Sequence, residues 1–155
     1  MKKPEIDKIP EWWPVCQNDG CPMEGECLRQ LARKEVLHDA TRWMSVLPSA
    51  LKDGDCQYFQ KAETVRMARG LHSTFKNLRD KNVRHNLRID LTGYFGSKGS
   101  FYRYKDGERW MNPQLQQMIA DYLKSYGCDD EPVFDEYAEG YDFTQLPTEQ
   151  KDGED

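Results

Sequence analysis

The chain has 155 residues, of which 37% are hydrophobic and 32% are charged, and its formal net charge is −5 at pH 7. No apolar run approaches the roughly 18 residues of a membrane span, and no apolar stretch follows the basic N-terminus as it would in a signal peptide. These features argue against a membrane protein and favour a cytoplasmic one, in which the five cysteines would remain reduced.

Charge is distributed unevenly along the chain, and this asymmetry is more informative than the net value. Residues 61–109 contain 12 basic and 5 acidic groups, whereas residues 110–155 contain 2 basic and 12 acidic groups. We therefore predict three parts in chain order: a cysteine-rich N-terminal module at 1–60, a basic helical region at 61–127, and an acidic aromatic tail at 128–155 that is partly disordered at its end.

The N-terminal part begins with a proline-rich arm that contains Trp12 and Trp13, and we expect burial of aromatic rings to hold this arm in place. Residues 16–27 are rich in Gly, Asp, Asn and Pro, which predicts a loop. A helix should begin near Glu26, and a second helical stretch is predicted at 38–47 before the next proline.

Three further helices are predicted from apolar positions that recur every three or four residues. The first covers residues 62–78, and the second covers residues 83–95 and ends at a glycine. The third starts with Asn112 as N-cap and Pro113 at the first helical position. Together these elements predict a mainly α fold: a small helical domain with an N-terminal cysteine-rich metal lobe and a helix-turn-helix-like centre.

Four cysteines with the spacing C-x4-C-x5-C-x28-C form the strongest candidate site. Three lie within one turn-rich loop, and a Gly-Asp turn just before the fourth lets the chain return to them. Zinc prefers four thiolates in a tetrahedron, and an iron–sulfur cluster also takes four. We predict a zinc site, with an iron–sulfur cluster as the alternative and buried free thiols or disulfides as the remaining interpretation. The predicted ligands are Cys16, Cys21, Cys27 and Cys56.

The other residues that could bind a metal are less suitable. The three histidines, His38, His72 and His85, lie on three different predicted elements. A lone helical histidine is more often a surface or core residue than a ligand. Cys128 lies apart, at the start of the acidic tail, and we expect it to be structural.

Residues 91–109 combine glycines, serines, aromatic rings and basic groups. One interpretation is a helix-turn-helix, in which the first helix ends at Phe95, a Gly-Ser pair forms the turn, and a short second helix faces a nucleic-acid groove. The glycine turn, the serines and the R-Y-x-x-G-E-R segment from Arg103 resemble those of repressor-type helix-turn-helix proteins. The likeness is confined to residues 91–123, and the connection to the next helix is longer here.

The alternative interpretation of this segment is a β-hairpin at 101–111, because Asp106 and Gly107 form a favoured two-residue turn. Tyrosines would then occupy one face and basic residues the other, an arrangement that can hold single-stranded nucleic acid. Under both interpretations we predict contact with nucleic acid through six residues: Lys98, Ser100, Tyr102, Arg103, Lys105 and Arg109.

The acidic aromatic tail could fold back on the basic surface and compete with phosphate groups, or it could dock on a basic protein partner. A solvated acidic segment is the simplest alternative.

No nucleophile elbow, phosphate loop, dinucleotide fingerprint or metalloprotease helix occurs in the sequence, so we predict no catalytic residues. We expect a metal-stabilised, non-enzymatic protein that binds DNA or has a regulatory role. The alternatives are a protein-interaction module that docks through its tail and an iron–sulfur redox sensor.

Segments spread over residues 6–143 resemble an uncharacterised family of small four-cysteine proteins from Bacteroidales, a domain of unknown function. The resemblance implies a cytoplasmic bacterial protein and brings no activity with it, so the metal and nucleic-acid predictions depend on the residues alone. The matching segments include Val15-Cys16, Cys21-Pro22, Gly54-Asp55-Cys56, Phe101-Tyr102-Arg103 and Phe134-Asp135-Glu136-Tyr137.

Overall fold

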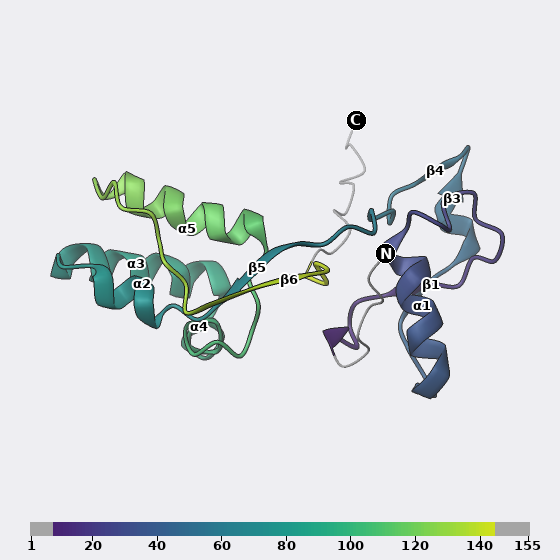
Figure 1. The fold of residues 1–155 in the computed structure, drawn as a ribbon, viewed down its shortest axis with the longest axis horizontal. Coiled ribbons are helices and arrows are strands. Elements are labelled where there is room, and N and C mark those ends of the chain that lie inside the picture. The colour runs from purple at the N-terminus through teal and green to yellow at the C-terminus, as the bar shows by residue number, and fades with distance from the viewer. Residues whose placement is uncertain (1–7, 145–155) are drawn as a thin grey trace. The chain divides into compact units, whose positions relative to one another are not determined.

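The computed structural model describes residues 8–144, which divide into two compact units (Figure 1). The described part of the first unit consists of residues 8–64 and 143–144, and the second unit is Val65–Asp142. The predicted disorder at the end of the tail falls outside the described residues.

Residues 8–144 contain five α-helices and six short strands, so the fold is mixed α/β and the prediction of a mainly α fold is wrong. The strands pair in three two-stranded sheets. Two predicted helices are wrong in part: residues 45–46 form a strand within the helical stretch predicted at 38–47. Within the helix predicted at 62–78, residues 65–69 form a strand and only residues 72–77 are helical. Both errors come from strand partners that are distant in the sequence.

The first unit is built around helix α1 (Leu28–Asp39), which the sequence predicted. Leu28, Ala32 and Val36 are buried at every fourth position, so one face of the helix packs inward and the other is solvated. This buried face lies against strand β1 (Val15–Cys16).

Strand β1 pairs in parallel with β2 (Ser45–Val46), which replaces the helical stretch predicted there. The indole of Trp43 donates a hydrogen bond to the carbonyl of Trp13 at 3.0 Å, and Trp13 is completely buried. The N-terminal arm is therefore held by burial of an aromatic ring, as expected, but its partner is an extended segment. A backbone that donates and accepts across a ladder cannot also form helical hydrogen bonds.

A short 3₁₀ helix, η2 (Pro48–Ala50), leads into a hairpin made of β3 (Leu51–Lys52) and β4 (Asp55–Cys56). The two residues of the hairpin turn, Asp53 and Gly54, both have positive φ, at 52° and 82°. This is the backbone geometry of the tight turns that suit twisted hairpin strands. The turn places the fourth cysteine at the end of β4.

The second unit contains the longest ladder among the described residues, in which β5 (Val65–Arg69) pairs antiparallel with β6 (Glu136–Gly140) (Figure 1). Ala68, the fourth residue of β5, also exchanges two backbone hydrogen bonds with Met111, at 3.0 and 2.7 Å. Gly70 follows β5 with φ +80°, which ends the strand and starts the turn into the helices.

Four helices follow β5 along the chain. Helix α2 (His72–Asn77) and helix α4 (Lys98–Lys105) are short, whereas α3 (Lys81–Phe95) and α5 (Pro113–Ser125) are long. The predictions of helices at 83–95 and from Asn112 onwards are confirmed. The side chain of Asn112 accepts a hydrogen bond from the backbone N–H of Leu115 at 2.8 Å, as the N-cap assignment requires.

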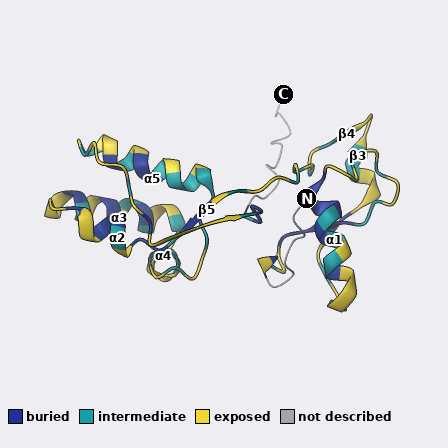
Figure 2. Ribbon diagram, in the orientation of Figure 1, coloured by how far each residue is buried: buried dark blue, intermediate teal, exposed yellow. Residues whose placement is uncertain are grey.

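The core of the second unit draws on every one of these helices and on β5 (Figure 2). Phe134, which precedes β6, is 5% exposed and belongs to the same core, so the C-terminal segment contributes to packing as well as to the ladder. The buried residues of the cluster are Ala68, Leu71, Phe75, Leu78, Val83, Leu87, Leu91, Phe101, Met111, Ile119, Leu123 and Phe134.

Candidate functional site

The four predicted metal ligands line one cavity of the first unit, although they lie on four different segments. Cys16 ends β1, Cys21 lies in the following loop, Cys27 is the N-cap of α1, and Cys56 ends β4. All four are free thiols. Cys16 and Cys27 are buried, and the other two are half-buried.

A small cavity of about 20 Å³ lies at the point where these segments meet. Its walls include all four cysteines, and the rest of the lining is largely apolar or aromatic, with Met23, Val46, Tyr58 and Phe59. A cavity of this size corresponds to roughly one small probe sphere, so the thiols surround a space close to the size of a single water or ion. All four cysteines of the predicted ligand set therefore line one cavity.

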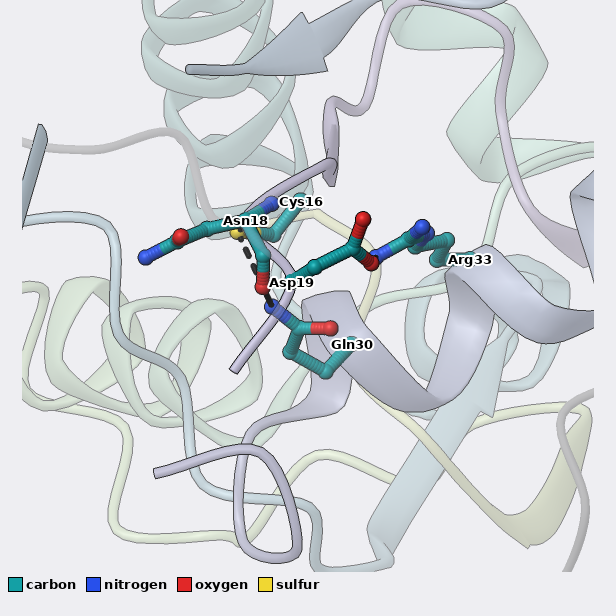
Figure 3. Close-up of polar contacts among 5 residues, drawn as sticks. All are labelled: Cys16, Asn18, Asp19, Gln30 and Arg33. Atoms are coloured by element: carbon teal, nitrogen blue, oxygen red, sulfur yellow. Dashed lines mark hydrogen bonds and ion pairs between the residues drawn. The ribbon is translucent and has the colours of Figure 1, made fainter. Parts of the chain in front are cut away.

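Cys16 has the most defined surroundings of the four (Figure 3). Its Sγ accepts hydrogen bonds from the backbone N–H of Asn18 at 3.4 Å and from Nε2 of Gln30 at 3.3 Å. The same Gln30 amide donates to the carbonyl of Asn18 at 2.7 Å, which fixes the loop against α1. Burial raises the pKa of the Cys16 thiol, the N–H of Asn18 lowers it, and the three neighbouring thiols raise it further.

Arg29 is a buried cation beside the same cluster. Its side chain is 2% exposed, donates to the carbonyls of Pro14 at 2.6 Å and Tyr58 at 2.7 Å, and stacks 4.4 Å from the ring of Trp13. Burial lowers the pKa of its guanidinium, and negative charge on Cys27, Cys56 and Cys16 would raise it. No carboxylate among residues 8–144 forms an ion pair with Arg29, so the cysteines are the groups nearby that could balance its charge.

Sequence reasoning missed both Arg29 and Gln30 as members of the site. The available signal was their position, since they lie two and three residues after the third cysteine, in the first turn of the helix that Cys27 caps. Further out on this helix, Arg33 pairs with the exposed Asp19 at 2.7 Å (Figure 3). Surface pairs of this kind contribute little to stability.

Within residues 8–144, no group of three or more His, Cys, Asp or Glu side chains is arranged so that it could hold a metal ion. The prediction of a metal lobe as a formed part of the fold is therefore wrong. The four thiols share a cavity, but they are not drawn together around one point in this conformation. Which residues would bind a metal remains a prediction.

The six residues predicted to contact nucleic acid lie in the second unit, on α4 and the turn that follows it. Residues 98–105 are helical, so the alternative of a β-hairpin at 101–111 is wrong. The helix begins at the Gly96-Ser97 turn, where the Ser97 hydroxyl accepts a hydrogen bond from the N–H of Ser100 at 3.1 Å. Phe101 is 1% exposed and anchors α4 in the core.

The exposed side of α4 carries some of the predicted contacts, whereas others are already engaged. Lys98, Tyr102 and Arg103 are exposed. Lys105 lies 5.5 Å from the ring of Phe75 and 5.6 Å from that of Tyr102, and Arg109 lies 5.7 Å from the ring of Tyr104. Lys105 is half-buried by these cation–π contacts, whereas Arg109 remains exposed.

Strand β6 of the acidic tail folds back on the basic segment within the second unit, because it pairs with β5 along its full length. The carboxylate of Asp135 accepts hydrogen bonds from the N–H groups of His72 and Ser73 at the start of α2, at 3.1 and 2.7 Å. The unit Val65–Asp142 contains 12 basic and 12 acidic residues. The excess positive charge of the sequence segment 61–109 is therefore balanced within the folded unit.

No helix among the described residues is both long enough and apolar enough to cross a membrane. In comparisons with known proteins, the chain matches no curated protein and no solved structure. It does match one family model, described as a family of unknown function (DUF6078), over residues 1–143. Since this match covers nearly the whole sequence, the chain belongs to the DUF6078 family.

Proposed function

We propose that this is a metal-stabilised binding protein, in which Cys16, Cys21, Cys27 and Cys56 bind one zinc ion. The observation that carries the proposal is the shared cavity, since four cysteines from four segments line a space of about 20 Å³. Four thiolates are a common ligand set for structural zinc. A metal ion would join the segments of a unit that has few buried apolar side chains of its own.

Charge balance around Arg29 supports the same proposal. A buried guanidinium without a carboxylate partner is costly, because an isolated charge loses its hydration on burial. A zinc ion bound by four thiolates carries a net negative charge, which would compensate Arg29. The N–H groups of Asn18 and Gln30 that point at Cys16 would stabilise the same charge, as hydrogen bonds to ligands commonly do in thiolate sites.

Metal binding requires the four sulfur atoms to close around the ion. Cys21 lies in a turn-rich loop and Cys56 at the end of a short hairpin, so both can move without disturbing α1. Binding would then be coupled to ordering of the unit. Thiolate ligands also require a reducing compartment, so the cytoplasmic location expected from the sequence forms part of the proposal.

The experiment is metal analysis of protein purified without oxygen, together with four single Cys→Ser variants. We expect one zinc ion per chain, and we expect each variant at the four positions to lose it. The matched control is Cys128→Ser, which removes a half-buried cysteine that does not line the cavity. The proposal would be contradicted if the wild-type protein contained no metal, or if all four single variants still contained one zinc ion per chain. Iron and sulfide with visible absorbance would establish the iron–sulfur alternative instead.

A second candidate function is nucleic-acid binding through α4. The observation that favours it is the helix itself, which follows a glycine turn and exposes Lys98, Tyr102 and Arg103 while Phe101 is buried. Such a helix could enter a groove in the way that recognition helices do. The balanced charge of the unit restricts this function to the local surface of α4, because no net positive field would attract phosphates from a distance.

The test uses fluorescence anisotropy with pooled duplex and single-stranded DNA at low and moderate salt. We expect the double variant Lys98→Glu/Arg103→Glu to abolish binding, and we expect wild-type affinity to fall steeply with salt. The control is Lys34→Glu/Lys124→Glu, which changes the charge equally at two exposed positions outside α4. Equal effects of the two double variants, or no binding by wild-type protein, would rule out this role for α4.

A further inference from the structure

A groove lies on the first unit beside strand β2, and it shares the lining residues Val46 and Tyr58 with the thiol cavity. It encloses about 710 Å³ and its walls include Trp12, Met44, Ser45 and Leu47. Concave sites of roughly 300–1,000 Å³ are typical of ligand pockets. The groove is formed entirely by residues 12–58, so it belongs to this unit alone.

Large apolar side chains line this groove and remain exposed. Trp12 is 47% exposed, Met44 is 56% exposed and Leu47 is 64% exposed. Single exposed apolar residues are normal on protein surfaces, but several around one concave site indicate an interaction surface. Lys52 and Asp55 add a charged group of each sign to the lining.

Residues of β2 line this groove, and one edge of β2 pairs with no other strand within residues 8–144. On its other edge, β2 uses the carbonyls of Met44 and Val46 to accept hydrogen bonds from β1, at 3.1 and 3.2 Å. Backbone groups of a strand alternate between its two edges, so the N–H and C=O of Ser45 and the N–H of Leu47 point away from β1. These groups have no backbone hydrogen-bond partner within residues 8–144, and both residues line the groove.

We propose that this groove binds an extended, apolar segment of a partner protein, which adds to the open edge of β2. The unpaired backbone groups of Ser45 and Leu47 select an extended chain, because only a strand presents N–H and C=O groups at matching intervals. Trp12, Met44 and Leu47 select bulky apolar side chains, which alternate along a strand and so would enter the groove at every second position. The proposal depends on the surface and its open strand edge, so it does not require that the thiols bind zinc.

The experiment selects decapeptides from a random displayed library on the full-length chain, with counter-selection against a Leu47→Glu variant. We expect enriched peptides with bulky apolar residues two positions apart. A synthetic peptide of the enriched sequence should bind about tenfold more weakly to Leu47→Glu. The control is Leu37→Glu, since Leu37 is equally a leucine, is 56% exposed on α1 and does not line the groove. This control should bind as wild type.

Strand addition is tested separately from apolar contact. The amide signals of Ser45 and Leu47 should shift and gain protection from hydrogen exchange when the peptide binds. Methylation of the peptide N–H groups on the paired edge should weaken binding by about tenfold.

Several results would overturn the proposal: no enriched peptide, equal binding to Leu47→Glu, or binding without protection of the Ser45 amide. Self-association that is sensitive to Leu47→Glu would also overturn it, because the occupant would then be a second copy of the chain.

Discussion

The guanidinium of Arg69 lies 2.5 Å from the carboxylate of Glu136, a residue 67 positions further along the chain. Both side chains are partly exposed, so the pair itself adds little to stability. Its importance is topological, because it joins the basic segment and the acidic tail of the sequence in one sheet. Nearby, the guanidinium of Arg66 lies 4.0 Å from the ring of Tyr137 in the same ladder.

Removal of residues 129–155 should unfold the second unit, because it deletes β6 and the buried Phe134 together. We expect the cooperative thermal transition of this unit, followed by circular dichroism, to be lost. The control is a chain that lacks only residues 145–155, which should retain the transition. If the chain that lacks residues 129–155 melts like the control, then β6 is not needed for folding of this unit.

Replacement of Asp135 by Asn should weaken the start of α2. Burial opposes ionisation of this carboxyl, but hydrogen bonds from Ser73 and His72 outweigh burial and lower its pKa below the ordinary value of 3.8. The carboxylate therefore stabilises the fold fully above pH 3.8, and this contribution is lost as the pH falls through the lower pKa of the folded state.

Urea unfolding should report a loss of about 1 kcal/mol for Asp135→Asn at pH 7, similar to the loss of an N-cap. The difference from wild type should shrink as the pH falls below 3.8. Asp129→Asn, at an exposed position of the same segment, should leave stability unchanged. A difference that is independent of pH would show that the charge of Asp135 is not the stabilising feature.

Gly70→Ala should be more destabilising than Gly96→Ala, although both glycines have nearly the same positive φ, +80° and +84°. A Cβ at Gly70 would lie 2.2 Å from Oδ2 and 2.7 Å from Cβ of Asp135, whereas a Cβ at Gly96 would meet nothing within 4 Å. Each variant incurs a backbone cost of roughly 1–2 kcal/mol, because a Cβ is disfavoured in the left-handed region. Only Gly70→Ala must also displace the carboxylate that caps α2. Equal free energies of unfolding for the two variants would contradict this explanation.

Arg29→Met should destabilise the first unit by roughly 3 kcal/mol, because it leaves the carbonyls of Pro14 and Tyr58 without their buried donor. Arg33→Met, four residues further along the same helix, removes only a surface pair with Asp19 and should cost less than about 1 kcal/mol. Urea unfolding measures both. If the thiols bind zinc, chelator competition should also show about tenfold weaker affinity for Arg29→Met alone.

The sequence by itself determined the elements whose signals are local. Helices α3 and α5 have apolar stripes and end signals that act within a few residues, such as the Asn112 cap and the Gly96 stop. The Gly-Ser turn predicted the short helix α4 in the helix-turn-helix interpretation, whereas the alternative was a β-hairpin. The four cysteines could be grouped because three are close in sequence and a Gly turn precedes the fourth.

Only the tertiary structure decided the rest, because strand pairing depends on partners far away in the sequence. Apolar steps of three and four in residues 62–78 fit a helix, but β6 supplies a ladder for β5 and overrides that local preference. For the same reason the basic segment and the acidic tail became one neutral unit. The buried Arg29 and the open edge of β2 also depend on packing, since periodicity shows which residues are apolar but not which backbone edge remains unpaired.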